Sequence, residues 1–331
     1  MRNFTCVQDV HNHDALLDLA VQFATHPLLH ATAGAGKTVG LVFMNPSLRT
    51  RLSTQKAAQL LGMHTLIINA NSEGWALEFN DDVIMNGSTV EHIRDAAPVL
   101  GQYCDILAVR CFPSLSDKKL DDSEHILLQF MRHAGIPVIS LESATRHPLQ
   151  SLSDWLTIHT HKKTAKPKVV LTWAPHIRAL PQAVANSFAE WMLAAEYDLH
   201  IACPEGMELN PEFTSGATLT HSQEEALEGA EFVYVKNWSS WKNYGQPLTG
   251  QAHWMLNDAK LKRTNNAYLM HCLPVRRDVE LPASLIESPQ SLITSQAANR
   301  VPAAQAVLYS LLQQTPSVNN LSHAIVAESE V

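Results

Sequence analysis

Short apolar runs alternate along the chain with longer segments in which apolar and polar residues are mixed. Most of the short runs are rich in β-branched residues and nearly free of charge, which predicts strands covered on both faces of a sheet. They lie at residues 39–44, 65–68, 106–109, 138–140, 169–172, 199–202, 232–235, 268–270 and 291–294. The pattern therefore predicts buried strands that recur along most of the chain.

Segments of helix length separate most of these strands. They lie at residues 49–61, 90–100, 123–133, 148–159, 181–194 and 297–312. Strands that alternate with helices indicate βαβ units and parallel sheets. The number of strands suits two sheets of four or five better than one sheet. The predicted fold class is α/β, with two Rossmann-like domains, each a parallel sheet flanked by helices.

The predicted domain boundary lies near the helix that begins at Pro148. Residues 1–147 would form the first domain and residues 148–298 the second. A link near Asn299 would return a last helix, residues 299–314, to the first domain. Residues 315–331 are polar and have no clear period, so a disordered tail is expected there.

Composition narrows the class of protein. The chain has 331 residues, of which 46% are apolar and 17% charged, as in a globular protein with a full core, so a disordered or fibrous chain is excluded. Its 24 basic and 32 acidic residues give a net charge of −8. Such a chain is a poor general binder of nucleic acid, so any anion site must be a local basic cluster.

Cysteine usage and hydropathy point to the cytoplasm. Five cysteines with no C-x-x-C pair argue against both a disulfide framework and a zinc ribbon, and fit a reducing compartment. No His, Cys or Asp cluster has metal-ligand spacing, so neither a metal nor a cofactor is expected. No stretch resembles a signal peptide or a membrane span.

Two glycine- or arginine-containing segments are candidates for anion binding. Residues 33–38, Ala-Gly-Ala-Gly-Lys-Thr, lack the first glycine of the phosphate-binding loop and precede a strand, so a plain turn is favoured. Residues 45–51 follow a strand and open a helix with Ser47 as N-cap and with Arg49 and Arg51 in the first turn. Arginines there oppose the helix dipole, which favours an anion cradle over a capped surface helix.

Ser47-Leu48-Arg49-Thr50-Arg51 resembles the S-x-R-T-R carbamoyl phosphate motif of the aspartate/ornithine carbamoyltransferase superfamily. Further matches follow in the family's order: Arg110 at a strand end, His147-Pro148-Leu149-Gln150 as HPxQ, His271-Cys272-Leu273-Pro274 as HCLP, and Asn299-Arg300 as the closing ENR motif with Ala298 replacing its acidic residue. The resemblance covers about residues 1–314. It implies a carbamoyl phosphate-binding first domain and transfer of a carbamoyl group to an amine.

The resemblance assigns the phosphate to the first motif. Ser47, the Leu48 N–H, Arg49 and Thr50 would hold it, and Arg300 would add positive charge nearby. Free N–H groups and guanidinium forks at a helix N-terminus suit a dianion. Arg49 is accordingly among the expected catalytic residues.

The carbonyl end of carbamoyl phosphate is assigned to the other motifs. Arg110 and His147 would act catalytically by binding the carbonyl oxygen, which becomes an oxyanion in the tetrahedral intermediate. Gln150 and the backbone carbonyls of Cys272 and Leu273 would accept hydrogen bonds from the carbamoyl NH₂. The departing phosphate is one acceptor for the amine's proton, and the identity of that acceptor stays open.

The second substrate is indicated by Lys236. Ornithine carbamoyltransferases carry an Asp at this point of a D-x-W-x-S-M-G stretch, which binds the free α-ammonium of ornithine. A lysine would repel that ammonium and attract a carboxylate, as in ornithine whose α-amine is acylated. Aspartate carbamoyltransferases are disfavoured because residues 175–187 lack their H-R-x-Q motif.

Further residues are similar to the acylornithine branch of the family. They are Trp75, Phe112, Glu142, His176 and Arg276. Glu142 would orient the attacking δ-amine, and Arg276 would bind the α-carboxylate. His176 and Lys236 would serve the acyl and carboxylate end, and Phe112 would line this pocket. Trp75 lies in a loop, residues 71–86, that in this branch reaches into the neighbouring subunit's carbamoyl phosphate site, which implies a homotrimer with shared active sites.

Val90 bears on the acyl group. The acetylornithine type carries Glu before the Glu-His pair and the succinylornithine type carries Pro, whereas this chain has Val90. A glutamate would repel a succinyl carboxylate and valine would not. Glu280 also replaces a lysine of the acetyl type. Both departures favour N-succinyl-L-ornithine, with N-acetyl-L-ornithine as the alternative.

Two hypotheses of other classes were weighed. An inactive paralogue acting as a scaffold would be supported by loss of Arg49, Arg110 or His147, and all three are present. A dinucleotide-dependent dehydrogenase is disfavoured because no G-x-G-x-x-G follows a strand. A cytoplasmic carbamoyltransferase of arginine biosynthesis, with two small-molecule substrates, is the expected function.

Overall fold

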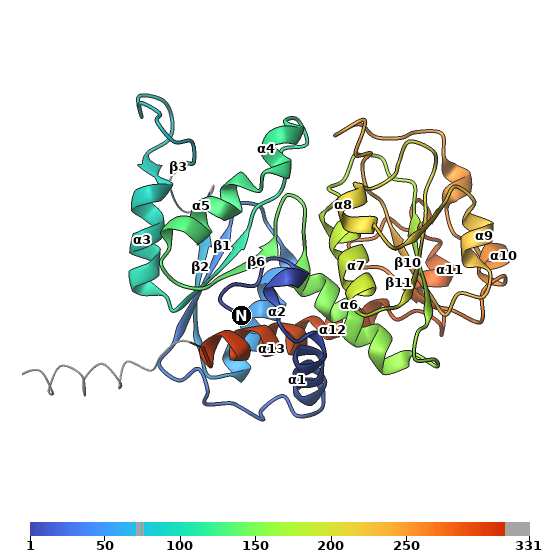
Figure 1. The fold of residues 1–331 in the computed structure, drawn as a ribbon, viewed down its shortest axis with the longest axis horizontal. Helices are drawn as coiled ribbons and strands as arrows, with labels where there is room; N and C mark the ends of the chain where they lie inside the picture. The colour runs from blue at the N-terminus through green and yellow to red at the C-terminus, as the bar shows by residue number, and fades with distance from the viewer. Residues whose placement is uncertain (71–73, 75, 315–331) are drawn as a thin grey trace, which may run out of the picture.

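The computed structural model describes residues 1–70, 74 and 76–314, which form two open parallel sheets side by side (Figure 1). The first sheet has the order β2-β1-β5-β6 and the second β11-β10-β7-β8-β9. The strands of the first sheet are β1 (Thr38–Phe43), β2 (His64–Asn69), β5 (Ile106–Arg110) and β6 (Val138–Glu142). Those of the second sheet are β7 (Lys168–Trp173), β8 (Asp198–Ala202), β9 (Thr218–Thr220), β10 (Phe232–Lys236) and β11 (Tyr268–Met270). The predicted α/β class with sheets of four and five strands is confirmed.

The uncharged strands are explained by helices on both faces of the sheet. In β1, Leu41 and Phe43 pack into one core, which includes residues of α1 (His13–Thr25) and α2 (Leu48–Leu60). Val42 points the other way, into a second core with α3 (Ile93–Tyr103) and α5 (His125–His133). Alternation along a strand sends successive side chains to opposite faces, so a doubly covered strand is apolar throughout.

The C-terminal helix α13 (Arg300–Leu312) returns to the first domain, as predicted. It packs against α1 and α2 and also contacts α6 (Pro148–His161), the helix that follows the first sheet (Figure 1). The boundary predicted at Pro148 coincides with the beginning of α6, which packs against β6 on one side and α7 (Ala183–Ala194) on the other. The division into residues 1–147 and 148–298 stays a prediction. The predicted tail, residues 315–331, lies outside the described residues.

The remaining elements are short. They are η1 (Val7–Asp9), β3 (Leu77–Glu78), β4 (Glu91–His92), α4 (Lys118–Asp122), α8 (Pro211–Thr214), α9 (Gln223–Leu227), η2 (Ala252–Trp254), α10 (Asp258–Leu261), α11 (Ala283–Ile286) and α12 (Ile293–Ala298). Sequence patterns missed α1 and the short strands β3, β4 and β9. A strand of two or three residues is too short to carry a periodic signal.

The strand predicted at residues 291–294 is wrong. Ser291 forms a single parallel bridge with Leu269, and α12 begins at Ile293. The helix predicted at residues 297–312 is also two helices, α12 and α13, which meet at Asn299. Pro302 explains the second beginning, because proline lacks an N–H and fits the first turn of a helix, where that group has no partner.

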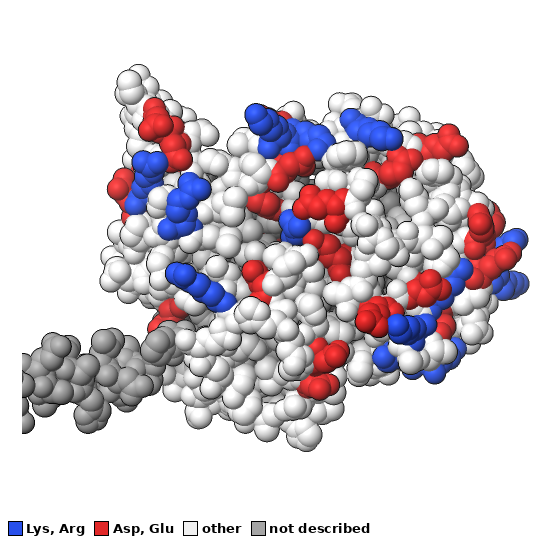
Figure 2. Space-filling model, in the orientation of Figure 1, with Lys and Arg blue, Asp and Glu red and all other residues white. Residues whose placement is uncertain are grey.

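The glycine-rich segment at residues 33–38 is a turn that leads into β1, as its pattern favours. Its Lys37 ammonium lies 2.8 Å from the Asp105 carboxylate, so this lysine has an acidic partner within the protein. None of the helices in the described ranges combines the length and the apolarity that a membrane span needs. On the face drawn in Figure 2, acidic and basic side chains are interspersed over both lobes.

Candidate active site

The carboxyl ends of strands from both sheets meet at one cavity of about 380 Å³. Arg110 and Glu142 are the last residues of β5 and β6, and Lys236 is the last residue of β10. Ser47 and Cys272 follow β1 and β11 within a few residues. Open parallel sheets bind ligands at this edge, because the loops there leave a crevice between them.

The cavity gathers most of the residues predicted from sequence. The predicted residues that line it are Ser47, Arg49, Thr50, Arg110, Phe112, Glu142, His147, Gln150, His176, Lys236, Cys272, Leu273, Arg276 and Arg300. They come from segments as far apart as α2 and α13. Motifs separated by up to 250 residues in sequence therefore form one site, since Thr50 and Arg300 are hydrogen-bonded to each other.

The N-terminus of α2 lines the side of the cavity where the predicted anion-binding residues lie; we call this the anion side. Ser47 caps the helix, because its hydroxyl accepts a hydrogen bond from the Thr50 N–H at 3.3 Å. The buried Thr50 hydroxyl oxygen accepts in turn from Arg110 at 3.2 Å and from Arg300 at 2.7 Å. Desolvation lowers the pKa of Arg49, and it lowers the pKa of Arg300 to about 10. Cations that lose water in this way favour an anionic partner.

Arg110, Glu142 and His147 form a buried cluster beside the N-terminus of α2. Arg110 donates a hydrogen bond to Glu142 at 2.6 Å, and His147 Nε2 lies 3.4 Å from the same carboxylate oxygen. The pairing of β5 with β6 shifts by one residue after Val109, so that Arg110 pairs with Glu142. Burial raises the pKa of Glu142 despite the opposing effect of Arg110. Burial, Arg300 and Arg110 hold the pKa of His147 well below its usual value, so its imidazole is neutral at pH 7.

Three buried nitrogen atoms of this cluster have no hydrogen-bond partner among the described residues: Arg49 Nε, Arg110 Nε and His147 Nδ1. Buried polar atoms in native proteins are nearly always paired. All three residues line the cavity, so a ligand bound there is the available source of the missing partners once the side chains adjust to it. For the two guanidinium nitrogens, which can only donate, that partner must carry acceptor oxygens.

The HPLQ and HCLP segments complete this side. The Gln150 amide oxygen accepts a hydrogen bond from Arg300 at 2.7 Å. The Leu273 N–H donates to His271 Nδ1 at 2.9 Å and shapes the turn after β11. Desolvation raises the pKa of the Cys272 thiol, which keeps it protonated. A protonated, buried thiol is a poor nucleophile, in line with the sequence interpretation that Cys272 contributes its backbone.

The opposite side of the cavity belongs to the second sheet. Arg276 Nε donates to His176 Nε2 at 3.1 Å, so these two residues form a unit at the cavity wall. The buried Lys236 ammonium donates to the Asn237 carbonyl at 3.1 Å. Phe112 lies beneath Arg110, with the guanidinium carbon 4.3 Å from the ring centre. Its role is thus also to support an arginine through a cation–π contact.

Sequence reasoning missed several lining residues. They are Arg178, Leu180, Pro181, Val184 and Pro274. Arg178 is the one with chemical consequence, since it adds a cation two residues after His176. The sequence held a signal for Arg178, because it lies in the same loop as His176, which was already predicted to bind the substrate. The cavity then carries five arginines and one lysine against a single carboxylate, Glu142.

Two predicted residues within the described ranges do not line the cavity of their own chain. The Leu48 side chain is 69% exposed, although its backbone lies in the first turn of α2. Val90 is 65% exposed and lies before β4, where its N–H donates to the Ala76 carbonyl at 2.9 Å. Trp75 lies outside the described residues. Within the described ranges no group of three His, Cys, Asp or Glu residues is arranged to hold a metal ion.

Comparison with known proteins defines the class to which this fold and site belong. The profile described as "Aspartate/ornithine carbamoyltransferase, carbamoyl-P binding domain" matches residues 2–160. The profile of the Asp/Orn binding domain of the same family matches residues 181–311. The chain belongs to the aspartate/ornithine carbamoyltransferase family and is a carbamoyltransferase.

Within that family the chain is similar to acylornithine enzymes. It is 48% identical to the N-succinylornithine carbamoyltransferase of Bacteroides fragilis (strain 638R), over 96% of this chain and all of that protein. It is 34% identical to the N-acetylornithine carbamoyltransferase of Xanthomonas campestris pv. campestris, over 91% of this chain and 94% of that protein. A crystal structure of N-acetyl-L-ornithine transcarbamylase complexed with acetylcitrulline matches with a TM-score of 0.89 at 32% identity, over 94% of this chain and 99% of that one.

Another solved structure is a variant of N-acetyl-L-ornithine transcarbamylase in which one glutamate is replaced by valine. It was solved in complex with carbamyl phosphate and N-succinyl-L-norvaline. It matches with a TM-score of 0.89 at 33% identity, over 94% of this chain and all of that one.

Proposed function

We propose that the protein transfers the carbamoyl group of carbamoyl phosphate to the δ-amine of N-succinyl-L-ornithine, which gives N-succinyl-L-citrulline and phosphate in arginine biosynthesis. The observation that carries the proposal is the set of unpartnered buried nitrogens, Arg49 Nε, Arg110 Nε and His147 Nδ1, on the wall of a cavity rich in arginine. Carbamoyl phosphate is a dianion with a polar carbonyl. It offers acceptor oxygens to the two guanidinium nitrogens and an NH₂ donor beside them.

In this proposal the first domain, residues 1–147, binds carbamoyl phosphate. Ser47, the Leu48 N–H, Arg49, Thr50 and Arg300 hold the phosphate at the N-terminus of α2. Phosphate suits this position because the helix dipole and the free N–H groups favour negative charge there. The dianion would also restore the interactions that Arg49 and Arg300 lose through burial.

The carbonyl oxygen lies between Arg110 and His147. A neutral imidazole retains one N–H, and Arg110 retains its unpartnered Nε–H. As the amine nitrogen bonds to the carbonyl carbon, these donors stabilise the oxyanion, which is worth about 3–4 kcal/mol per donor in other acyl-transfer sites. The carbon–oxygen bond to phosphate then breaks. Gln150 and the Cys272 and Leu273 carbonyls hold the carbamoyl NH₂.

Glu142 has a second task. In the structure its carboxylate accepts from Arg110 at 2.6 Å and faces the cavity between the two lobes. From that position it can also accept a hydrogen bond from the δ-amine and direct the nitrogen lone pair at the carbonyl carbon. Alignment of two reactants in this way lowers the entropic part of the barrier.

The second domain, residues 148–298, binds the acylornithine. Arg276 binds the α-carboxylate, and His176 with Lys236 serves the succinyl end, where Phe112 lines the pocket. The excess of positive charge supports a diacid acceptor, because N-succinyl-L-ornithine carries two carboxylates and N-acetyl-L-ornithine carries one. We propose that Val90 is the counterpart of the glutamate replaced in the relative solved with N-succinyl-L-norvaline.

We further propose a cytoplasmic homotrimer with shared active sites, in which Trp75 and Val90 serve the neighbouring subunit. Leu48 and Leu52 are exposed one helical turn apart on α2, and Leu66 is exposed on the edge strand β2. Exposed leucines on successive elements favour a protein–protein contact. The five cysteines, all free, suit a reducing compartment.

A phosphate-release assay tests the function directly. Carbamoyl phosphate is supplied with ornithine, N-acetyl-L-ornithine, N-succinyl-L-ornithine or aspartate in parallel reactions, with an amine-free reaction as the control for spontaneous hydrolysis. We expect the highest kcat/KM with N-succinyl-L-ornithine. A higher value with N-acetyl-L-ornithine would replace the proposed acceptor, and no release with any amine would refute carbamoyl transfer.

A further inference from the structure

Asp154 is a fully buried carboxyl group just behind the cavity, one helical turn after Gln150 on α6. One of its oxygens, Oδ1, accepts two hydrogen bonds. Gln150 Nε2 donates at 2.8 Å and Gln296 Nε2 donates at 2.7 Å. Asp154 does not line the cavity itself, so it can reach a ligand there only through its neighbours.

The two glutamines connect Asp154 by hydrogen bonds to Arg300 and to the HCLP turn. Because each amide turns its NH₂ toward Asp154, each turns its oxygen away. The Gln150 oxygen accepts from Arg300 at 2.7 Å, and the Gln296 oxygen accepts from the His271 N–H at 2.9 Å. One carboxyl oxygen therefore sets the orientation of the HPLQ glutamine, the HCLP turn and Arg300. A rotated Gln150 amide would present NH₂ groups to Arg300, which has no acceptor.

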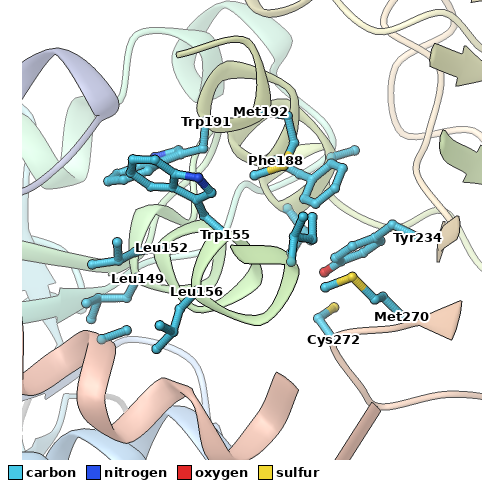
Figure 3. Close-up of a cluster of buried hydrophobic side chains, with 14 of the residues drawn as sticks. Leu149, Leu152, Trp155, Leu156, Phe188, Trp191, Met192, Tyr234, Met270 and Cys272 are labelled. Carbon is cyan, nitrogen blue, oxygen red and sulfur yellow. The ribbon is translucent and has the colours of Figure 1, made fainter. Parts of the chain in front are cut away.

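The other oxygen of Asp154, Oδ2, accepts no hydrogen bond of standard geometry among the described residues, although the Tyr234 hydroxyl lies close enough to interact with the carboxyl. The titratable and charged groups that face the carboxyl are Arg300 from α13, Tyr234 from β10 and Cys272 after β11. Figure 3 shows Tyr234 and Cys272 together beside α6. Burial raises the pKa of Asp154 to about 7, against the lowering effect of Gln150, Gln296, Tyr234 and Arg300. A proton can therefore reside on Oδ2 while Oδ1 keeps both hydrogen bonds.

We propose that Asp154 is a positioning residue for carbamoyl phosphate, which orients Gln150, Gln296 and through them Arg300 by Oδ1 and takes up a proton on Oδ2 when the dianion binds. The proposal rests on the proposed carbamoyl phosphate site. Its physical basis is that a second negative charge behind Arg300 opposes the incoming dianion, whereas a neutral acid does not. With a pKa raised to about 7, Asp154 is mostly neutral well below that pH, and well above it binding draws a proton from solution.

Two variants of Asp154 separate the two oxygens. Asp154→Asn keeps an acceptor oxygen in place of Oδ1 and removes the titration. Asp154→Leu removes both oxygens at similar volume. Thr160→Val is the control, since Thr160 lies on the same helix, does not line the cavity, and its hydroxyl donates to the Leu156 carbonyl within α6 at 2.7 Å. Carbamoyl phosphate binding is measured by calorimetry at pH 6 and pH 8.5, in buffers of different ionisation enthalpy so that proton uptake is counted.

For the wild type we expect uptake of a proton at pH 8.5 and none attributable to Asp154 at pH 6. The ratio of wild-type to Asp154→Asn Kd should be near one at pH 6 and on the order of tenfold at pH 8.5, with the wild type weaker there. Taking the ratio cancels the ligand's own ionisation. Asp154→Leu should raise Kd about tenfold or more at both pH values, while the KM for the acceptor amine stays within about twofold. Thr160→Val should bind like the wild type.

Each other result counts against the proposal. A folded Asp154→Leu protein with wild-type Kd would show that Gln150 and Gln296 keep their orientation without the Asp154 carboxyl as acceptor. Should that variant fail to fold, an Asp154→Asn ratio that is equal at both pH values would by itself overturn the proton-linked role. Absence of carbamoyl phosphate binding by the wild type would overturn the proposed function and this proposal together, whereas binding that no variant alters would overturn the role of Asp154 alone.

Discussion

Burial removes water from single charged side chains of this site. Arg49, Arg110 and Arg300 lose water on folding, and the N–H groups of Arg49 Nε and Arg110 Nε donate no hydrogen bond to the described residues in exchange. A buried cation without a full set of partners costs stability. In the proposed function the oxygens of carbamoyl phosphate supply the missing partners, so we expect these arginines to matter more for turnover than for folding.

Arg49→Ala tests that expectation at one residue. The change removes a guanidinium that suits bidentate phosphate binding, and we expect kcat/KM for carbamoyl phosphate to fall on the order of 10²-fold or more. Arg51→Ala is the matched control, because Arg51 lies on the same turn of α2 but is exposed and does not line the cavity. Steady-state kinetics on both folded variants decide it. Equal losses would mean that the motif acts by general positive charge.

At the scale of elements, the segment from β3 to β4 projects from the first lobe. Its residues are largely exposed, and Ile84 reaches 82% exposure. Val90 lies at its end, away from its own chain's cavity. In the proposed homotrimer, a segment with so little burial in its own chain serves the neighbouring subunit, where its side chains would select the acyl group.

Val90→Glu should reverse the choice of acceptor. A carboxylate at this position would lie near the succinyl carboxylate, and two like charges about 4 Å apart repel by about 4 kcal/mol at an effective dielectric near 20. We expect kcat/KM to fall for N-succinyl-L-ornithine and to rise for N-acetyl-L-ornithine, with little change in carbamoyl phosphate affinity. Val99→Glu, an exposed site on α3, controls for added charge. If both variants leave the ratio of the two acceptors unchanged, Val90 does not face the acyl pocket.

The whole molecule works as two lobes that must meet across the cavity. A loop of the second lobe, residues 241–246, contacts the first lobe near α4 (Figure 1). The Tyr244 hydroxyl donates to Asp121 at 2.9 Å, and the Lys118 ammonium lies 4.9 Å from the centre of the Trp241 ring. Gly245 has a φ of 71°, and a Cβ there would lie 2.0 Å from the Leu115 carbonyl oxygen. A close backbone approach thus joins the lobes on one side of the site.

Gly245→Ala should push the lobes apart at this contact. We expect KM to rise several-fold for both substrates, because each is bound by residues that face each other across the cavity, and we expect a lower Tm. Gly250→Ala is a stringent control. Its φ of 77° imposes similar backbone strain, but no atom lies within 4 Å of the added Cβ, so only the contact with Leu115 differs. Thermal unfolding and kinetics of the pair decide it, and identical behaviour would assign the whole effect to backbone strain.

Assembly is tested by complementation between subunits. Trp75→Ala and Arg49→Ala each damage a different half of a shared site, so each variant alone should be inactive. In mixed trimers some interfaces carry an intact Trp75 from one subunit and an intact Arg49 from its neighbour, and partial activity should return. Sedimentation verifies the trimer. Verified mixed trimers that remain inactive would contradict a shared site.

The sequence by itself determined most of the strands of the two large sheets and predicted most of the described residues that line the cavity. Apolar β-branched runs predicted β1, β5, β7 and β10 because a doubly covered strand must be apolar on both faces. The motifs at residues 47–51 and 147–150, which follow β1 and β6, predicted the chemistry through their resemblance to the carbamoyltransferase family, and the structure brings them to the carboxyl edge of the first sheet. Local pattern was sufficient for these features.

Tertiary structure alone decided the rest. The register between β5 and β6 brings Arg110 and Glu142 into contact, and sheet register depends on packing that no single segment encodes. The same holds for Arg178 on the cavity wall and for Asp154, whose two glutamine partners lie 4 and 142 residues away. Burial also decided which groups are neutral, because the low pKa of His147 and the raised pKa of Asp154 follow from desolvation that exists only in the folded chain.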